Sequence, residues 1–347
     1  MTNFRPYPFL STKIQSLTFI IASLLLTSAN AAQSLNDFDG WKKNLKIELS
    51  DRGLPNEIVN LAINNASNTF APSNTDSKRT YSENTPQQLV ENGFIQKAAL
   101  FRSENNTLIS QIARKYKISE HFILTLWGLE TGFNQDAHPN ITAIESLVYR
   151  VYQNKRDYQS KQELIGILKS IDQGGTELSQ LQSKSDGTIG QLSLQPSMYR
   201  QYAVDQDEDG EIDVWNSIPD SIASAANVLS HNGWKQGEPW GYEIKLPIDT
   251  DPSVIGLTRQ VSIETLKSYG ATMIDDQEIP ESGVLASIIQ PQGSLGPSYL
   301  VFNNFFSLLR WHRSADFALA FGLLADKLDQ SGTMDANLPI ANAFETN

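Results

Sequence analysis

The chain has 347 residues, a formal net charge of −12, 19% charged residues, 40% hydrophobic residues and no cysteine. The hydrophobic fraction supports a buried core and excludes a wholly disordered protein, while the acidic balance argues against nucleic-acid binding, which depends on Lys and Arg contacts to phosphate. The absence of cysteine excludes disulfides, thiol nucleophiles, Cys-ligated zinc, iron–sulfur clusters and membrane attachment through a lipidated cysteine.

Residues 1–31 have the pattern of a secretory signal peptide. Arg5 and Lys13 supply the positive charges, Leu17–Leu26 is the apolar segment, and Ala29-Asn30-Ala31 fits a cleavage site. The apolar segment is too short to span a bilayer, which needs roughly 20 residues. We therefore expect an exported, periplasmic protein without a membrane anchor after cleavage, with an uncleaved N-terminal anchor as the alternative.

Helical periodicity dominates the chain as far as residue 232, and short β-like runs follow it. A polar segment near residues 66–87 is expected to be an exposed loop, the C-terminal lobe covers about residues 241–330, and the tail 331–347 is expected to be loose. These features predict a mostly α fold with a small mixed α/β lobe. The predicted helices are Leu35–Asn65 in two pieces separated at Leu54-Pro55, Gln88–Lys117, Ser119–Gly132, Ile144–Tyr152, Lys161–Ile171, Pro196–Tyr202, Pro219–Asn232 and Ser314–Leu328, and the predicted strands are Tyr242–Leu246, Leu285–Gln290 and Ser298–Val301.

Glu130 is unusual for its place in the predicted helix Ser119–Gly132. It follows Leu126 by four residues and Ile123 by seven, so it shares their apolar face. A carboxyl group on such a face is desolvated, which raises its pKa toward the range of a general acid. The alternative is a Glu at a helix end that is paired with a basic residue or exposed.

Several ordered motifs together resemble the membrane-bound lytic murein transglycosylase B family. The resemblance extends roughly from Leu35 to Asp329. The motifs are WGLETGF around Glu130, Gly187-Thr188-Ile189-Gly190-Gln191, Pro196-Ser197-Met198-Tyr199, YAVDQDEDGEIDVW, and GPSYLVFNNFFSLLRWHRSADFALAFG near the end of the chain.

The resemblance implies a lysozyme-like helical catalytic domain over residues 32–330. It also implies cleavage of the MurNAc–GlcNAc β-1,4 bond of peptidoglycan with formation of a 1,6-anhydroMurNAc end, and it maps the single catalytic acid and base to Glu130. Asp157 and Glu163 follow it further along the chain, and we interpret both as solvated helix charges. The substrate-binding residues carried over by position are Lys155, Arg156, Gln191, Ser193, Tyr199, Asn227 and His312.

An acidic run over residues 205–216 matches an EF-hand calcium loop through its ninth position, with Gly210 at the sharp turn. The last position, usually a bidentate Glu, is the neutral Asn216, for which Asp213 partly compensates. We expect a structural calcium site of reduced affinity, with a metal-free acidic turn as the alternative. The predicted ligands are Asp205, Asp207, Asp209, Glu211 through its carbonyl, and Asn216.

The chain departs from the family pattern at several positions that would contact sugar. Ser193 stands where the family has Gln, Val228 where it has Tyr, and Lys155 where it has Arg. His312 replaces Asn and Phe317 replaces Tyr. Two hypotheses therefore remain: a divergent lytic transglycosylase, or a weakly active or non-catalytic peptidoglycan-binding protein on the same fold.

The remaining expectations concern cofactors and partners. The four histidines form no HExxH or other close ligand pair, and the chain has no phosphate loop, dinucleotide fingerprint or Gly-x-Ser-x-Gly elbow. We therefore expect no organic cofactor and no nucleic-acid partner. The expected partner is the peptidoglycan glycan strand, and cell-wall synthesis proteins are candidate partners.

Overall fold

The structure is a computed structural model that describes residues 37–67, 85–133, 141–175, 180–280 and 283–332. The chain divides into two compact units, one formed by residues 1–72 and 142–181 and the other by residues 73–141 and 182–347. The predicted signal peptide lies outside the described residues, as do most of the polar loop near 66–87 and nearly all of the tail 331–347.

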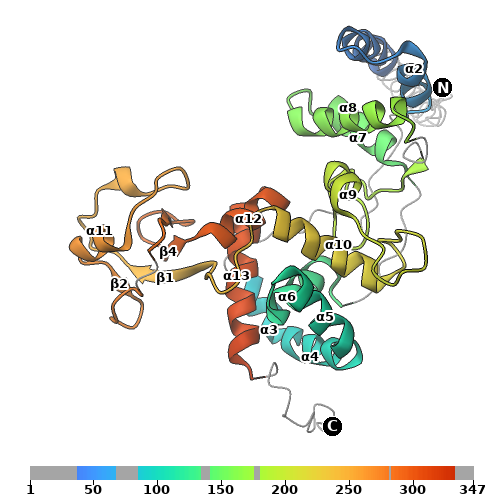
Figure 1. Cartoon of the computed structure of the whole chain (residues 1–347). Helices are drawn as coiled ribbons and strands as arrows, with labels where there is room; N and C mark the ends of the chain where they lie inside the picture. Colours follow the sequence, from blue (N-terminus) through green and yellow to red (C-terminus); the bar gives the residue numbers. More distant parts are fainter. Residues whose placement is uncertain (1–36, 68–84, 134–140, 176–179, 281–282, 333–347) are drawn as a thin grey trace, which may run out of the picture. The chain divides into compact units, whose positions relative to one another are not determined.

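The first unit is helical and contains a helix over residues 37–51, α2 (Asn56–Asn64), α7 (Ala143–Gln153) and α8 (Tyr158–Asp172) (Figure 1). Pro55 precedes α2, as predicted, because a proline lacks the N–H that a first helical turn leaves unpaired. A capping box between Thr142 and Glu145 begins α7. Helices α7 and α8 pack against each other, and α2 packs against both.

The two acidic residues interpreted as solvated charges belong to this unit, and that interpretation is wrong. The Asp157 carboxylate caps α8 by accepting from the Ser160 N–H, and it pairs with Arg150 at 3.1 Å. Burial acts to raise the pKa of Asp157, but the Ser160 hydrogen bonds and the Arg150 charge outweigh it and leave that pKa below its usual value. Glu163 is buried, with 8% of its surface exposed.

The second unit contains most of the helices. The predicted helix Gln88–Lys117 corresponds to three shorter helices. Gly93, in a left-handed conformation (φ 80°), separates the first from the second, and Asn105 separates the second from the third. Helices α4, α5 and α6 lie together (Figure 1), and α13 packs against α6, α12 and α3. The helices are α3 (Thr85–Glu91), α4 (Phe94–Glu104), α5 (Asn106–Tyr116), α6 (Glu120–Thr131), α9 (Pro196–Tyr202), α10 (Ile218–His231), α12 (Asn303–His312) and α13 (Ala315–Gln330).

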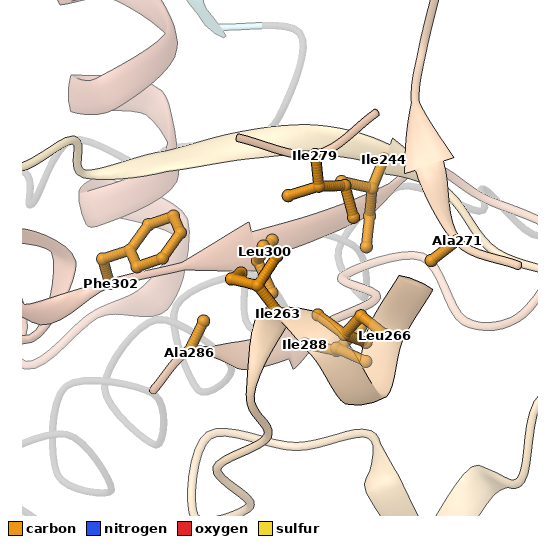
Figure 2. Packing of buried hydrophobic residues seen from close by; sticks show 9 residues of the cluster. All are labelled: Ile244, Ile263, Leu266, Ala271, Ile279, Ala286, Ile288, Leu300 and Phe302. Atoms are coloured by element: carbon orange, nitrogen blue, oxygen red, sulfur yellow. The ribbon is translucent and has the colours of Figure 1, made fainter. Parts of the chain in front are cut away.

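A four-stranded antiparallel sheet forms the lobe that follows α10. Its order is β2-β1-β4-β3, from β1 (Gly241–Lys245), β2 (Thr272–Met273), β3 (Ser287–Ile289) and β4 (Ser298–Val301). The short helices η3 (Pro252–Val254) and α11 (Ile263–Ser268) lie between β1 and β2 in the chain. The apolar core of the lobe, shown in Figure 2, consists of Ile244, Ile263, Leu266, Ala271, Ile279, Ala286, Ile288, Leu300 and Phe302.

The C-terminal helix α13 joins this lobe to the helices of the second unit. The Trp240 ring lies directly against Gly322 of α13, so closely that a Cβ atom at Gly322 would overlap the ring. The Trp240 indole N–H donates to the Asp326 carboxylate at 3.0 Å, one helical turn further along α13. These contacts attach the start of β1 to the helical part of the same unit.

The predicted fold class, mostly α with a small mixed lobe, is confirmed. Within the described ranges, no helix is both long enough and apolar enough to cross a membrane.

Candidate active site

The end of helix α6 places Glu130. Gly132 ends the helix in a left-handed conformation (φ 64°), and its N–H donates to the Gly128 carbonyl at 2.8 Å. The Thr131 hydroxyl donates to the Trp127 carbonyl at 2.7 Å and accepts from the Phe133 N–H at 3.1 Å. The backbone on both sides of Glu130 is therefore fixed by hydrogen bonds.

Gly128 allows aromatic rings to approach this last turn. A Cβ atom at Gly128 would overlap the rings of Phe133 and Phe94, which meet edge to face with centroids 5.0 Å apart. The Phe101 ring stacks on Trp127 with centroids 5.2 Å apart. The turn that carries Glu130 is consequently packed against aromatic side chains.

The two carboxylate oxygens of Glu130 have different environments. Oε2 accepts a hydrogen bond of 2.7 Å from the Ser193 hydroxyl. Oε1 is shielded from solvent and has no hydrogen-bond partner among the residues that the structure describes. Such an unpaired buried oxygen is costly unless something else satisfies it, which marks it as the position where a reacting group could bind.

Ser193 reaches Glu130 from a tight loop. The residues on either side of the loop, Ile189 and Leu194, form a β-bridge in which each N–H donates to the other's carbonyl at 2.8 Å. Ser193 adopts a left-handed conformation (φ 53°), which is unfavourable for a residue with a side chain and recurs at functional sites. The loop is held a second time where the Gln191 N–H donates to the Val214 carbonyl at 3.0 Å.

Lys184 also contacts this loop. Its ammonium group donates to the Ser193 hydroxyl at 2.9 Å and to the Gln191 carbonyl at 3.2 Å. Lys184, Ser193 and Glu130 thus form a continuous chain of hydrogen bonds within the second unit.

The other predicted substrate-binding residues of this unit make different contacts. The Gln191 side chain is buried and donates to the Trp215 carbonyl at 2.8 Å, while Asn227 donates to the Tyr202 carbonyl at 2.9 Å. Tyr199 is half-buried on α9. His312 stacks on Phe317, with ring centroids 4.1 Å apart and planes 12° apart. Ser193 is therefore the predicted residue for which the structure gives a hydrogen bond to Glu130.

Lys155 and Arg156 lie in the turn between α7 and α8 of the first unit, and both are exposed. The Arg156 N–H donates to the Asn154 side-chain oxygen at 3.1 Å, which shapes the turn.

The acidic loop brings three of its predicted calcium ligands together. One carboxylate oxygen from each of Asp205, Asp207 and Asp209 lies within 4.8 Å of the others. Oδ1 of Asp205 is buried and has no hydrogen-bond partner in the described part of the chain. This orphaned oxygen and the set of hard oxygen donors fit a calcium ion.

The remaining predicted ligands are placed by the loop's own hydrogen bonds. The Glu211 N–H donates to Asp209 at 2.9 Å, and the Asn216 amide group donates to Asp213 at 2.7 Å. The buried Asp220 of α10 holds the loop by accepting from the Gln206 and Asp213 N–H groups at 2.6 and 2.9 Å.

Comparison with known proteins places the chain in a family. The sequence profile of the transglycosylase SLT domain matches residues 37–326. The chain belongs to the transglycosylase SLT domain family. The match covers the Glu130 turn, the Ser193 loop and the acidic loop, and the helical fold of the family is the predicted lysozyme-like one.

Three relatives of this transglycosylase domain are informative. The chain is 24% identical over 229 residues to the membrane-bound lytic murein transglycosylase B of Escherichia coli, an alignment that covers 65% of this chain and 61% of that protein. It is similar to SltB3 of Pseudomonas aeruginosa in complex with NAG-NAM-pentapeptide, with 26% identity, a TM-score of 0.66, and coverage of 88% of this chain and 83% of that one. It also has the fold of the Escherichia coli lytic transglycosylase SLT35 in complex with calcium, with 20% identity, a TM-score of 0.63, and coverage of 84% and 93%.

Sequence reasoning missed Lys184 and Asp220, which form hydrogen bonds to the Ser193 loop and to the acidic loop of this transglycosylase domain. Lys184 is far from Glu130 in sequence and belongs to no motif, so its contact with Ser193 appears only in three dimensions. The contacts of Asp220 could have been predicted from the sequence. An acidic residue in the first turn of a helix just after an acidic loop is well placed to accept hydrogen bonds from backbone N–H groups.

Proposed function

We propose that this chain is a lytic transglycosylase that cleaves the MurNAc–GlcNAc β-1,4 bond of peptidoglycan and leaves a 1,6-anhydroMurNAc end. The observation that carries this proposal is Glu130, a carboxylate at a packed helix end with one oxygen bound by Ser193 and the other buried and unpaired. Membership of the transglycosylase SLT domain family supports it. The NAG-NAM-pentapeptide bound to SltB3 supports peptidoglycan as the substrate.

In this mechanism one carboxyl group acts twice. Glu130 first donates its proton to the glycosidic oxygen as the bond to C1 breaks, and the electron pair of that bond stays with the leaving oxygen. The substrate's own 2-acetamido group can stabilise the positive charge at C1, as in the substrate-assisted glycosidases. The Glu130 carboxylate then takes the proton of the C6 hydroxyl while that oxygen attacks C1. No second carboxylate and no water molecule are needed.

Ser193 has a defined role in these two proton transfers. Its hydroxyl donates to Oε2, so it stabilises the carboxylate form of Glu130 between the two proton transfers. The sugar contacts are assigned to Lys155, Arg156, Gln191, Tyr199, Asn227 and His312 by the resemblance to the family.

Calcium is proposed to bind the acidic loop in a structural role. Asp205, Asp207 and Asp209 would supply carboxylate oxygens, with Glu211 and Asn216 as the further ligands. A bound calcium ion would neutralise the clustered charge and stabilise the loop that Asp220 anchors. The complex of SLT35 with calcium is consistent with this role.

The remaining parts of the proposal concern location and organisation. Residues 1–31 are proposed to be a cleaved signal peptide and residues 32–330 the catalytic domain, with the C-terminal lobe from about residue 241. The protein would then act in the periplasm on glycan strands, where cell-wall synthesis proteins are candidate partners.

A second candidate, a weakly active or non-catalytic peptidoglycan-binding protein, is favoured by one observation. Where the resemblance predicts an amide, a hydroxyl or an aromatic contact to sugar, the chain has Ser193, Phe317 and Val228. A lost hydrogen bond to an uncharged partner typically costs about 0.5–1.5 kcal/mol, so these changes together weaken binding of the sugar.

Digestion of purified sacculi, followed by mass analysis of the released fragments, separates the two candidates. The wild type is expected to release anhydro-muropeptides, and Glu130→Gln, which keeps an acceptor for Ser193 but cannot transfer the proton, is expected to release almost none. Glu104→Gln, at an exposed position at the end of α4, is the matched control and should match the wild type. Wild type and Glu130→Gln that both bind sacculi and release nothing would instead support the binding protein.

A further inference from the structure

The direction of the hydrogen bonds from Lys184 to Glu130 is fixed by chemistry. A lysine ammonium group has three donors and no acceptor, so the Ser193 oxygen must accept from Lys184. The Ser193 hydroxyl has one proton of its own, and the acceptor that the described residues offer to it is Oε2 of Glu130 at 2.7 Å. The chain therefore runs from ammonium to hydroxyl to carboxylate.

This direction distinguishes the two oxygens of Glu130. Because Oε2 accepts from Ser193, the protonated acid carries its proton on Oε1, the oxygen that is buried and unpaired in the described part of the protein. Without the ammonium group, the hydroxyl could turn and accept a proton from Oε2, which would point the acid proton at Ser193 rather than at the substrate.

We propose that Lys184 is a positioning residue that acts through Ser193 to place the transferable proton of Glu130 on Oε1. This inference rests on the proposed function. In the first step the proton leaves Oε1 for the glycosidic oxygen, which keeps the electrons of the broken bond to C1. In the second step the C6 oxygen bonds to C1 and its proton returns to Oε1, so Glu130 is restored and the Ser193 proton never leaves its oxygen.

The loop geometry offers a second reason for Lys184 to be present, which the experiment must separate from the first. Its ammonium group also donates to the Gln191 carbonyl at 3.2 Å, so it could act only by holding the loop. Ser193 makes the separation possible. Its left-handed backbone (φ 53°) suits glycine, so Ser193→Gly removes the hydroxyl without straining the loop.

The test is a double-mutant cycle of Lys184→Met and Ser193→Gly, with the rate of anhydro-muropeptide release measured against sacculus concentration. We expect Lys184→Met to lower kcat about tenfold, because a hydrogen bond to a charged group is lost, and to leave KM nearly unchanged. In the Ser193→Gly background, Lys184→Met should lower kcat no further. Lys184→Arg keeps a charged donor and should retain more kcat than Lys184→Met. Lys245→Met, which removes an exposed ammonium paired with Asp276, is the matched control.

The outcomes are distinct. Three results would overturn the inference while the proposed function stands. Lys184→Met could have the same kcat as the control, it could change KM alone, or it could lower kcat in the Ser193→Gly background as much as it does in the wild type. A wild type that releases no anhydro product overturns the proposed function and this inference with it. Thermal unfolding shows which variants fold, and Lys184→Leu, which likewise has no hydrogen-bond donor, replaces Lys184→Met, with the same expected result, where the methionine variant does not fold.

Discussion

Asp326 should make the stability of the second unit depend on pH. Burial raises the pKa of Asp326 to about 6 from 3.8, the charge of Asp329 adds to the rise, and the hydrogen bond from Trp240 opposes it. A carboxyl group whose pKa is raised by folding binds its proton more tightly in the folded state. Its contribution to stability is therefore fully present below its unfolded pKa, about 4, and is lost as the pH rises through about 6.

The magnitude follows from the pKa difference. One pKa unit corresponds to about 1.4 kcal/mol, so a rise of about 2 units costs up to about 3 kcal/mol above pH 7. The observed value will fall below this figure, because the side chain is partly exposed to solvent. Asp326→Asn removes the charge and keeps an oxygen that can accept from Trp240.

The assay is urea unfolding of wild type and Asp326→Asn at a series of pH values. We expect Asp326→Asn to gain stability relative to wild type as the pH rises from about 4 to about 7, by up to about 3 kcal/mol. The comparison at each pH cancels the titration of the other groups. Circular dichroism and tryptophan fluorescence should be recorded together, because two compact units can unfold separately.

Asp316→Asn is the matched control, since Asp316 is exposed on the same helix. A stability difference between Asp326→Asn and wild type that stays constant over this pH range would contradict a raised pKa of Asp326. So would a variant that becomes less stable than wild type as the pH rises.

Two further predictions concern packing and calcium. Gly322→Ala should destabilise the protein by about 1–3 kcal/mol or more, because its Cβ atom overlaps the buried Trp240 ring. Gly40→Ala, whose Cβ atom meets open space, should be neutral or slightly stabilising. Equal melting temperatures for the two variants would contradict this account. Calcium at about 100 times its dissociation constant should stabilise the wild type by about 2.7 kcal/mol, and Asp205→Asn by less. A melting temperature of the wild type that is the same with calcium and with a chelator would argue for a metal-free turn.

The helices were predictable where their ends carry strong local signals. Helix α9 begins at Pro196, and α6 ends at Thr131 with Gly132 as its C-cap, as their sequence patterns indicate. Strand β4 has the predicted bounds. Helix α11 and strand β2 were missed, since elements of six and two residues are too short for hydrophobic periodicity to be visible. Helix α12 was missed because its residues were assigned to the lobe as a whole.

The site was predictable only in part. The apolar helix face made Glu130 a candidate, and the resemblance of the surrounding motifs to the lytic murein transglycosylase B family assigned the catalytic role to it; that role stays a prediction. The roles of Ser193 and Lys184 depend on a β-bridge and a left-handed residue, which bring distant segments together and leave no periodic pattern. Glu163 was predicted to be solvated and is buried. A charged residue in a helix is usually solvated, and the sequence pattern around Glu163 gives no sign of burial.

The central claim is that Glu130 acts as both acid and base without water. Digestion of sacculi in ¹⁸O-labelled water tests it most directly, because water that attacks C1 leaves its oxygen in the product. The account predicts anhydro ends that are lighter than reducing ends by one water and carry no label, and their loss in Glu130→Gln. Labelled reducing ends from the wild type would identify a hydrolase and contradict the claim.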